Sequence, residues 1–130
     1  IPKSLKNNII LYGHIELEEL KKLYKKCGIG LIMFNNVGQY YMSYSLKLFE
    51  YMYFGLYVLM PNFGEWKIFN ENFKAGLSLD PIDPKKYSKI LKRLDIETFK
   101  TTSKRNFKNA RKYFVWENEV NKLINFYEKI

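Results

Sequence analysis

The sequence predicts an α/β fold: a Rossmann-like parallel sheet with helices on both faces, followed by a helical C-terminus. Short apolar runs without alternation are typical of buried parallel strands, and amphipathic segments alternate with these runs through the first 80 residues. The last third of the chain contains amphipathic segments only. With 130 residues, 47% of them hydrophobic, the chain can bury one core but hardly two, so we expect a single domain over residues 1–130.

The first predicted strand is residues 9–12, Ile-Ile-Leu-Tyr, which Gly13 ends. A helix follows, with glutamates in its first turns, lysines in its last turn and Gly28 as its stop, an order of charges that complements the helix dipole. Its apolar face is formed by residues spaced three and four apart, namely Leu17, Leu20, Leu23 and Tyr24. Residues 29–34 are a second apolar run and predict the second strand.

The middle of the chain continues this alternation of strands and helices. Its expected elements, in order, are a polar and aromatic loop over residues 35–44, a helix over 45–54 that Gly55 ends, a strand over 57–60, a short helix over 65–69 and a fourth strand over 77–79. Strands that alternate with helices predict a parallel sheet covered on both faces.

Three amphipathic helices are expected to complete the chain. The apolar face of the first contains Tyr87, Ile90, Leu91 and Leu94, and the second is expected to turn Phe99, Phe107, Ala110 and Phe114 inward. The last has one apolar stripe of Trp116, Val120, Leu123, Ile124 and Tyr127. We interpret this stripe as a packing surface rather than a ligand site.

The net charge of +9 is concentrated in one region, because the stretch from Lys85 to Lys112 contains eleven Lys or Arg residues and two acids. A solvated helix face and a surface for anionic lipid or nucleic acid both fit this pattern. No stretch is long and apolar enough for a transmembrane helix, and no signal peptide is recognisable. We therefore expect a cytoplasmic protein. The lack of an initiator Met suggests that upstream sequence is missing.

Two loops are expected at the carboxyl ends of the strands, where ligands bind in open parallel sheets. One contains Gly13 and His14, and the other covers residues 35–45. His14 is the only histidine and Cys27 the only cysteine, so a histidine cluster or a zinc site is excluded and we expect no metal or other cofactor. The longer loop is the stronger candidate, because compact domains rarely keep long irregular loops without a use for them.

Glu50 is the most unusual residue of the chain, because it lies in an otherwise apolar stretch of the helix that follows this loop. A carboxylate in such a place needs partners. It could accept two hydrogen bonds from a sugar diol, as carboxylates do with ribose in dinucleotide folds. It could equally form an ion pair with Lys47, three residues earlier on the same helix.

Residues 45–55, Ser-Leu-Lys-Leu-Phe-Glu-Tyr-Met-Tyr-Phe-Gly, resemble the motif helix of family 4 glycosyltransferases with the GT-B fold, in particular those that build capsular or surface polysaccharides. The resemblance extends over nearly all of the chain. It includes the Tyr-Gly-His-Ile sequence at residues 12–15, the strand over 29–34, Glu65, and Phe-Val-Trp-Glu at 114–117.

The resemblance implies that this chain is the part of a two-domain enzyme that binds a nucleotide-diphosphate sugar, such as a UDP-sugar or a GDP-sugar, for a transfer that usually retains anomeric configuration. Glu50 would bind the ribose hydroxyls, and the backbone around Ser45 and Leu46, with Lys47 on the same turn, would face the diphosphate. Gly13 and His14 would lie near the base. Residues 41–44, including Ser43 and Tyr44, would lie near the donor sugar.

The resemblance also implies what is missing. Many relatives have a second glutamate eight positions before the ribose glutamate, where this chain has Met42, so we expect loop backbone and tyrosines to hold the sugar. The acceptor-binding N-terminal domain and the first two strand–helix units of the sugar-nucleotide domain are absent. The missing strands would lie between residues 9–12 and 29–34. We expect this part alone to be inactive, and its catalytic residues stay unassigned.

The partners expected from this interpretation are the nucleotide-sugar donor, the rest of the enzyme and the inner face of the membrane, with peripheral contact through Lys85 to Lys112; no nucleic acid is expected. The alternative is a noncatalytic basic α/β interaction domain that binds nucleic acid or an anionic membrane. Its binding would fall steeply with salt and would not depend on Glu50.

Overall fold

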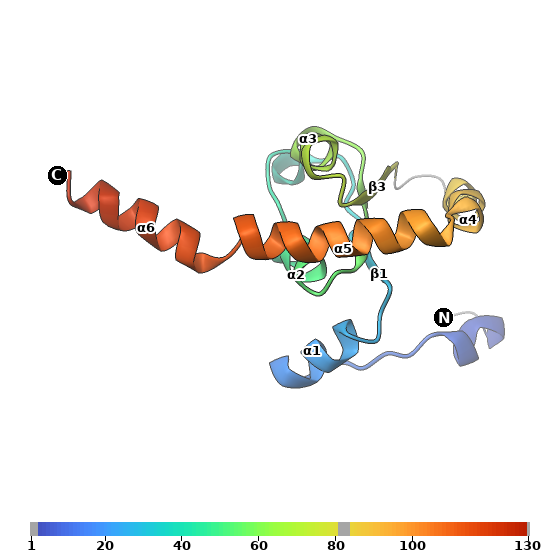
Figure 1. The fold of residues 1–130 in the computed structure, drawn as a ribbon. Coiled ribbons are helices and arrows are strands. Elements are labelled where there is room, and N and C mark those ends of the chain that lie inside the picture. The colour runs from blue at the N-terminus through green and yellow to red at the C-terminus, as the bar shows by residue number, and fades with distance from the viewer. Residues whose placement is uncertain (1–2, 81–83, 130) are drawn as a thin grey trace.

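The computed structural model describes residues 3–80 and 84–129, and it has the α/β architecture that the sequence predicts (Figure 1). Its sheet contains β1 (Ile29–Leu31), β2 (Tyr57–Pro61) and β3 (Gly76–Leu79), all parallel and in the order β1-β2-β3. Helices connect consecutive strands, as parallel pairing requires. The predictions for these three strands are confirmed, although β1 is shorter than residues 29–34.

The predicted strand over residues 9–12 is wrong. This segment follows a 3-10 helix, η1 (Lys3–Asn8), and has no strand assignment. Its four apolar side chains are 40–77% exposed. A strand needs a neighbouring strand to accept its backbone hydrogen bonds, and none of the described strands pairs with this segment. Residues 9–12 therefore have the composition that is typical of a strand, but they have no neighbouring strand among the described residues with which to pair.

One face of the sheet is covered by three helices: α2 (Leu46–Tyr53), α3 (Gly64–Phe73) and α5 (Ile96–Tyr113). The core between them is formed mainly by Ile32, Leu48, Met52, Val58, Met60, Trp66, Phe69 and Ala110. The other face is covered by α4 (Pro84–Arg93), whose Tyr87, Ile90 and neighbouring Leu94 pack on Tyr57, Leu59 and Leu79. Helices therefore lie on both faces, as predicted.

The central strand β2 is buried along its whole length. Its neighbour β3 approaches so closely that a Cβ atom on Gly76 would lie 1.9 Å from the carbonyl oxygen of Val58. Asn106 of α5 is fully buried, and its side-chain amide donates hydrogen bonds to the carbonyl oxygens of Leu56 (2.8 Å) and Ala75 (2.6 Å). These bonds fasten α5 to the residues that precede β2 and β3.

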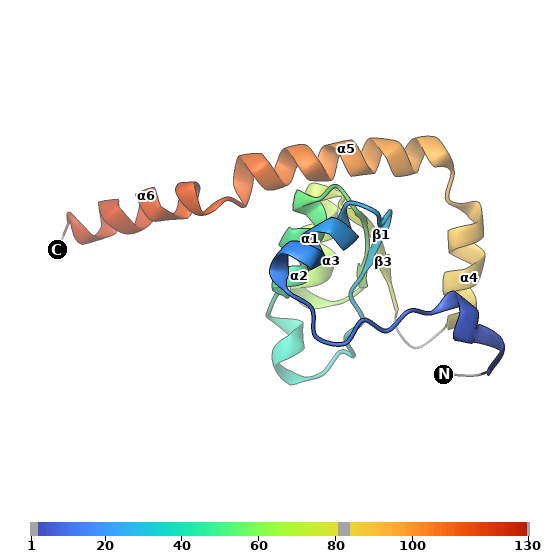
Figure 2. The same ribbon diagram turned by 90° about the horizontal axis from the view of Figure 1, so that it is seen from below.

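The two ends of the chain pack much less than the sheet and its covering helices. Helix α1 (Leu17–Tyr24) contains no buried residue and contacts α2 through Tyr24, whose ring lies 5.5 Å from Tyr51 and 5.3 Å from Phe54. Helix α6 (Trp116–Tyr127) also contains no buried residue, and Figures 1 and 2 show it extending away from the rest of the molecule.

The apolar stripe on α6, interpreted from the sequence as a packing surface, is not covered by any described element, because Trp116 is 68% and Leu123 46% exposed. Helical periodicity defines an apolar face, but burial requires a second surface that this helix does not reach. Phe107 of α5, also expected inward, is half-exposed and lies beneath the guanidinium of Arg111. Within the described ranges, no helix is both long and apolar enough to cross a membrane.

Candidate functional site

Helix α2 begins where the sequence predicts, because Ser45 is its N-cap. The Ser45 backbone is extended, and its Oγ atom accepts a hydrogen bond from the backbone N–H of Lys47 at 3.3 Å. Gly55, with a φ of 73°, follows the last turn. Since α2 follows β1 through a loop, its N-terminus belongs to the carboxyl edge of the sheet, the edge at which ligands bind in such folds.

The loop over residues 35–45 is fixed against α3 by aromatic side chains. It contains a short 3-10 helix, η2 (Gly38–Tyr41). The indole N–H of Trp66 donates to the backbone carbonyl of Tyr40 at 2.9 Å, and the Tyr40 ring stacks on Phe34 with 4.6 Å between centroids. These contacts give an irregular loop a defined conformation.

Tyr44 at the end of this loop is held on the first turn of α3. Its hydroxyl donates to the carboxylate of Glu65 at 3.1 Å and lies 3.2 Å from the carbonyl oxygen of the same residue. Burial, together with the hydrogen bond to Glu65, raises the pKa of Tyr44 to about 12. Tyr44 was expected near a donor sugar, and the structure shows a hydroxyl already engaged by Glu65. Ser43, beside it, is exposed.

Glu50 lies midway along α2 and faces α1. Its Oε2 atom accepts a hydrogen bond of 3.0 Å from the hydroxyl of Tyr24, and both residues are partly buried. Burial and this hydrogen bond to a carboxylate raise the pKa of Tyr24. Among the described residues, Glu50 forms no ion pair, so the predicted pair with Lys47 is wrong. Lys47 is exposed and contributes its backbone N–H to the cap of the helix.

Glu50 lines a surface pocket of about 280 Å³ between α1, α2 and the end of α5. The pocket wall is mainly aromatic, and its lining residues are Leu17, Lys21, Tyr24, Phe49, Glu50, Tyr53, Phe54 and Phe114. Among the described residues, Tyr24 is the only hydrogen-bond partner of the Glu50 carboxylate, so Oε1 can accept further bonds. A carboxylate between aromatic walls can bind a polyol whose apolar face lies on a ring.

The other predicted site residues are spread along the surface around this pocket. Leu46 is 77% exposed and lines a neighbouring pocket of about 420 Å³, which shares Phe49 and Phe114 with the pocket of Glu50. Gly13 and His14 are exposed in the segment that leads to α1, and neither forms a hydrogen bond or ion pair with any other described residue. Glu50 and Leu46 therefore lie in two neighbouring pockets and not in one.

Sequence reasoning missed Tyr24 and Glu65 as partners of the predicted site residues. Tyr24 was assigned to the apolar face of the first helix, yet it is the only residue of that face that carries a hydroxyl. This hydroxyl was the available signal, because a buried tyrosine usually finds a hydrogen-bond partner. Glu65 carried no comparable signal, since its contact with Tyr44 depends on how α3 sits beside the loop.

The fold and the site define a class of structure: a parallel α/β domain in which the helix that follows the first strand carries a carboxylate into an aromatic pocket. Within the described residues, no group of three or more His, Cys, Asp or Glu side chains could hold a metal ion. In comparisons with known proteins, no family model matches the chain, and no curated protein or solved structure matches it with significance.

Proposed function

We propose that the chain is the donor-binding part of a glycosyltransferase and that it holds a nucleotide-diphosphate sugar along α2. The support comes from the resemblance of residues 45–55 to the motif helix of family 4 glycosyltransferases and from the position of α2 at the carboxyl edge of a parallel sheet. The α/β architecture is compatible with this function but is shared by proteins of many others.

The observation that carries the proposal is the state of the Glu50 carboxylate. It is partly buried, bonded at Oε2 by a neutral hydroxyl and not neutralised by a cation in the described chain. A ribose diol can donate to Oε1, and a second hydroxyl can replace that of Tyr24 at Oε2. The rings around Glu50 offer apolar surfaces on which a base or sugar can pack.

The test is a calorimetric titration of UDP, GDP and their common sugar conjugates into the chain and into Glu50→Gln. The substitution keeps the shape of the side chain and removes its charge. We expect the dissociation constant to rise at least about tenfold, since a hydrogen bond to a charged group contributes roughly 1.5–3 kcal/mol. The matched control is Glu71→Gln, because Glu71 is an exposed glutamate of α3 whose only ion pair among the described residues is with Lys67.

Selective binding of one base that is lost in Glu50→Gln and kept in Glu71→Gln would support the proposal and identify the base. Equal affinity of the chain and Glu50→Gln would contradict the role of Glu50. Failure of a folded chain to bind any of these nucleotides would contradict donor binding by this part of the protein.

The wider proposals follow from the same resemblance. The complete enzyme would contain an acceptor-binding domain, would act in surface polysaccharide or glycoconjugate synthesis and would transfer a hexose with retention of configuration. It would work in the cytoplasm, in peripheral contact with the inner face of the membrane through the basic stretch from Lys85 to Lys112. We assign no catalytic residue within this chain.

A second candidate function is favoured by the exposure of that same stretch. The basic residues of α4 and α5 are exposed apart from the half-buried Arg105, and Lys100 forms an ion pair of 3.8 Å with Glu97. A noncatalytic domain that binds nucleic acid or an anionic membrane would use this surface. Binding to DNA or anionic vesicles that falls steeply with salt and is identical in Glu50→Gln would favour it over donor binding.

A further inference from the structure

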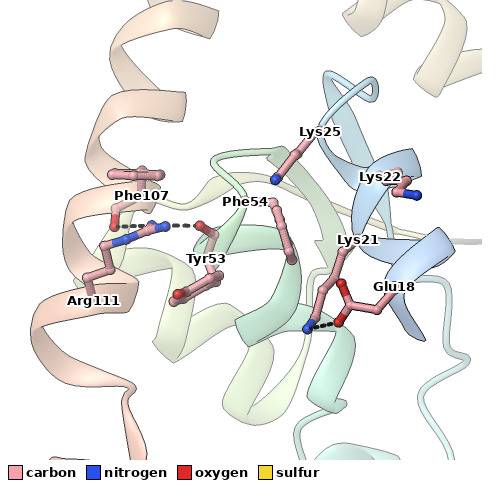
Figure 3. Close-up of a pocket in the computed structure, with 8 residues that line it drawn as sticks. All are labelled: Glu18, Lys21, Lys22, Lys25, Tyr53, Phe54, Phe107 and Arg111. Atoms are coloured by element: carbon pink, nitrogen blue, oxygen red, sulfur yellow. Dashed lines mark hydrogen bonds and ion pairs between the residues drawn. The ribbon is translucent and has the colours of Figure 1, made fainter.

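A larger pocket lies at the other end of α2 from Ser45. It has a volume of about 480 Å³ and lies between α1, the last residues of α2 and α5 (Figure 3). Its lining residues are Glu18, Lys21, Lys22, Lys25, Tyr53, Phe54, Phe107 and Arg111. This pocket adjoins the pocket of Glu50 and shares Lys21, Tyr53 and Phe54 with it, but none of the residues predicted for the donor site lines it.

The charge of the pocket is strongly unbalanced, because four cationic side chains line it together with one carboxylate. The carboxylate of Glu18 is paired with Lys21 at 2.6 Å. Lys22, Lys25 and Arg111 have no acidic partner among the described residues. Like charges gathered in one concavity repel each other and attract a multivalent anion.

Arg111 is fixed in place before any ligand binds. Its guanidinium carbon lies 3.3 Å from the ring centroid of Phe107 and 4.1 Å from that of Tyr53. One terminal nitrogen donates to the carbonyl oxygen of Tyr53 at 2.7 Å, with a longer contact of 3.4 Å to that of Phe107. The other terminal nitrogen and Nε have no protein partner in the described chain. A guanidinium held in this way loses little side-chain entropy when it binds an anion.

The three lysines that line the pocket from the α1 side differ in the direction of their amines. In Figure 3 the amine of Lys25 points across the pocket toward Phe54, whereas the amine of Lys22 points away from it. Lys21 is turned toward Glu18, with which it pairs. The cations available from two sides of the pocket are therefore Lys25 on α1 and Arg111 on α5, with aromatic rings between them.

We propose that this pocket binds a phosphate group, with Lys25 and Arg111 as its principal ligands and Lys21 as a supporting cation. A phosphate is compact and multivalent, and its oxygens match the fork of a guanidinium. Aromatic walls exclude part of the water around the anion, which strengthens its attraction to both cations. The phosphate belongs either to a free phosphorylated molecule or to a lipid headgroup. This proposal does not depend on the donor-binding role of Glu50.

The test is a calorimetric titration of inorganic pyrophosphate into the chain and into Lys25→Ala and Arg111→Ala. The controls are Lys26→Ala and Lys108→Ala, which remove the same charge from neighbouring positions that do not line the pocket. We expect saturable binding that weakens about tenfold in each pocket variant and less than about twofold in each control. Equal weakening in the controls, or no saturable binding, would overturn the proposal.

Arg111→Ala also removes contacts with Tyr53, so Lys25→Ala decides the matter if Arg111→Ala unfolds. Lys25 is the exposed C-cap residue of α1 and forms no side-chain bond with a described residue, and a thermal melt followed by circular dichroism checks that its variant is folded.

The source of the phosphate is distinguished by sedimentation with vesicles of phosphatidylcholine alone and of phosphatidylcholine mixed with phosphatidic acid. Binding to the mixed vesicles that pyrophosphate competes away supports a lipid headgroup. Pyrophosphate binding without vesicle binding supports a free phosphorylated molecule. Vesicle binding that Lys25→Ala leaves unchanged, in a chain that does not bind pyrophosphate, would overturn the pocket as the site.

Discussion

The centre and the two ends of this molecule contain similarly apolar segments but bury them very differently. All five residues of β2 are buried, whereas the four residues at positions 9–12 are 40–77% exposed and α6 contains no buried residue. The difference lies in the neighbours: β2 has a strand on each side and helices on both faces, while α6 extends away from these layers and residues 9–12 pair with none of the described strands (Figure 2). An apolar segment is therefore buried only where a second element of the protein packs against it.

The largest expected effect comes from adding one methyl group in the centre of the molecule. In Gly76→Ala the new Cβ would overlap the backbone of Val58, which cannot move aside without breaking the pairing of β2 with β3. We expect a loss of at least about 4 kcal/mol in the free energy of unfolding, enough to unfold many small domains. Urea denaturation followed by circular dichroism measures this loss.

Gly13→Ala is the matched control at the periphery. Gly13 has a φ of 67°, but a Cβ on it would meet nothing within 4 Å. Only the left-handed backbone conformation then opposes the alanine, at a cost of roughly 1 kcal/mol. Similar losses for the two variants would contradict the contrast between centre and ends.

The sequence was sufficient for elements whose boundaries are set locally. Ser45 as a cap and Gly55 as a stop identify α2, and the uninterrupted apolar run of residues 57–60 identifies β2. Residues 9–12 show the same kind of run, but whether such a run pairs depends on a neighbouring strand, which local pattern does not encode. The apolar stripe of α6 is uncovered for the same reason, because periodicity specifies a face and not the surface that covers it.

For the candidate site, as for the fold, the sequence predicted the positions of residues along the chain but not their long-range partners. The place of Glu50 on α2 follows from the sequence, but its bond to Tyr24 depends on how α1, 26 residues earlier, packs against α2. Asn106 is harder still: it lies in a basic, polar helix and resembles a solvated residue, yet it is fully buried and bonded to two backbone carbonyls. Long-range contacts of polar side chains have no periodic signature.

Tyr24→Phe tests whether the hydrogen bond between α1 and α2 contributes to the free energy of unfolding. The substitution keeps the ring packed on α2 and removes the hydrogen bond to Glu50, so we expect a loss of about 1 kcal/mol near neutral pH. Urea denaturation measures it. No loss would indicate that the hydrogen bond to Glu50 contributes nothing to stability and that α1 is held by the packing of the Tyr24 ring alone.

The same variant has a signature at high pH. The folded-state pKa of Tyr24 is raised above its ordinary value of 10.0, and that of Tyr44 is raised to about 12. A raised pKa contributes stability that is complete below about pH 10 and is lost as the pH rises through the folded-state value. We therefore expect unfolding to become easier above about pH 10, and less steeply with pH in Tyr24→Phe. An unchanged slope would contradict the raised pKa of Tyr24, which burial and the hydrogen bond to Glu50 cause together.

The smallest effects are expected at the exposed ends, in Leu11→Ser and Leu123→Ser. Leu11 is 77% and Leu123 46% exposed, so each substitution should change the free energy of unfolding by no more than about 0.5 kcal/mol. Leu48→Ser, at a fully buried position of α2, is the contrasting variant and should cost several times more. If Leu11→Ser or Leu123→Ser cost as much as Leu48→Ser, that end would be packed in solution. The open edge of β1 would then be the first surface to examine as the neighbour of residues 9–12, because among the described strands β1 pairs only with β2.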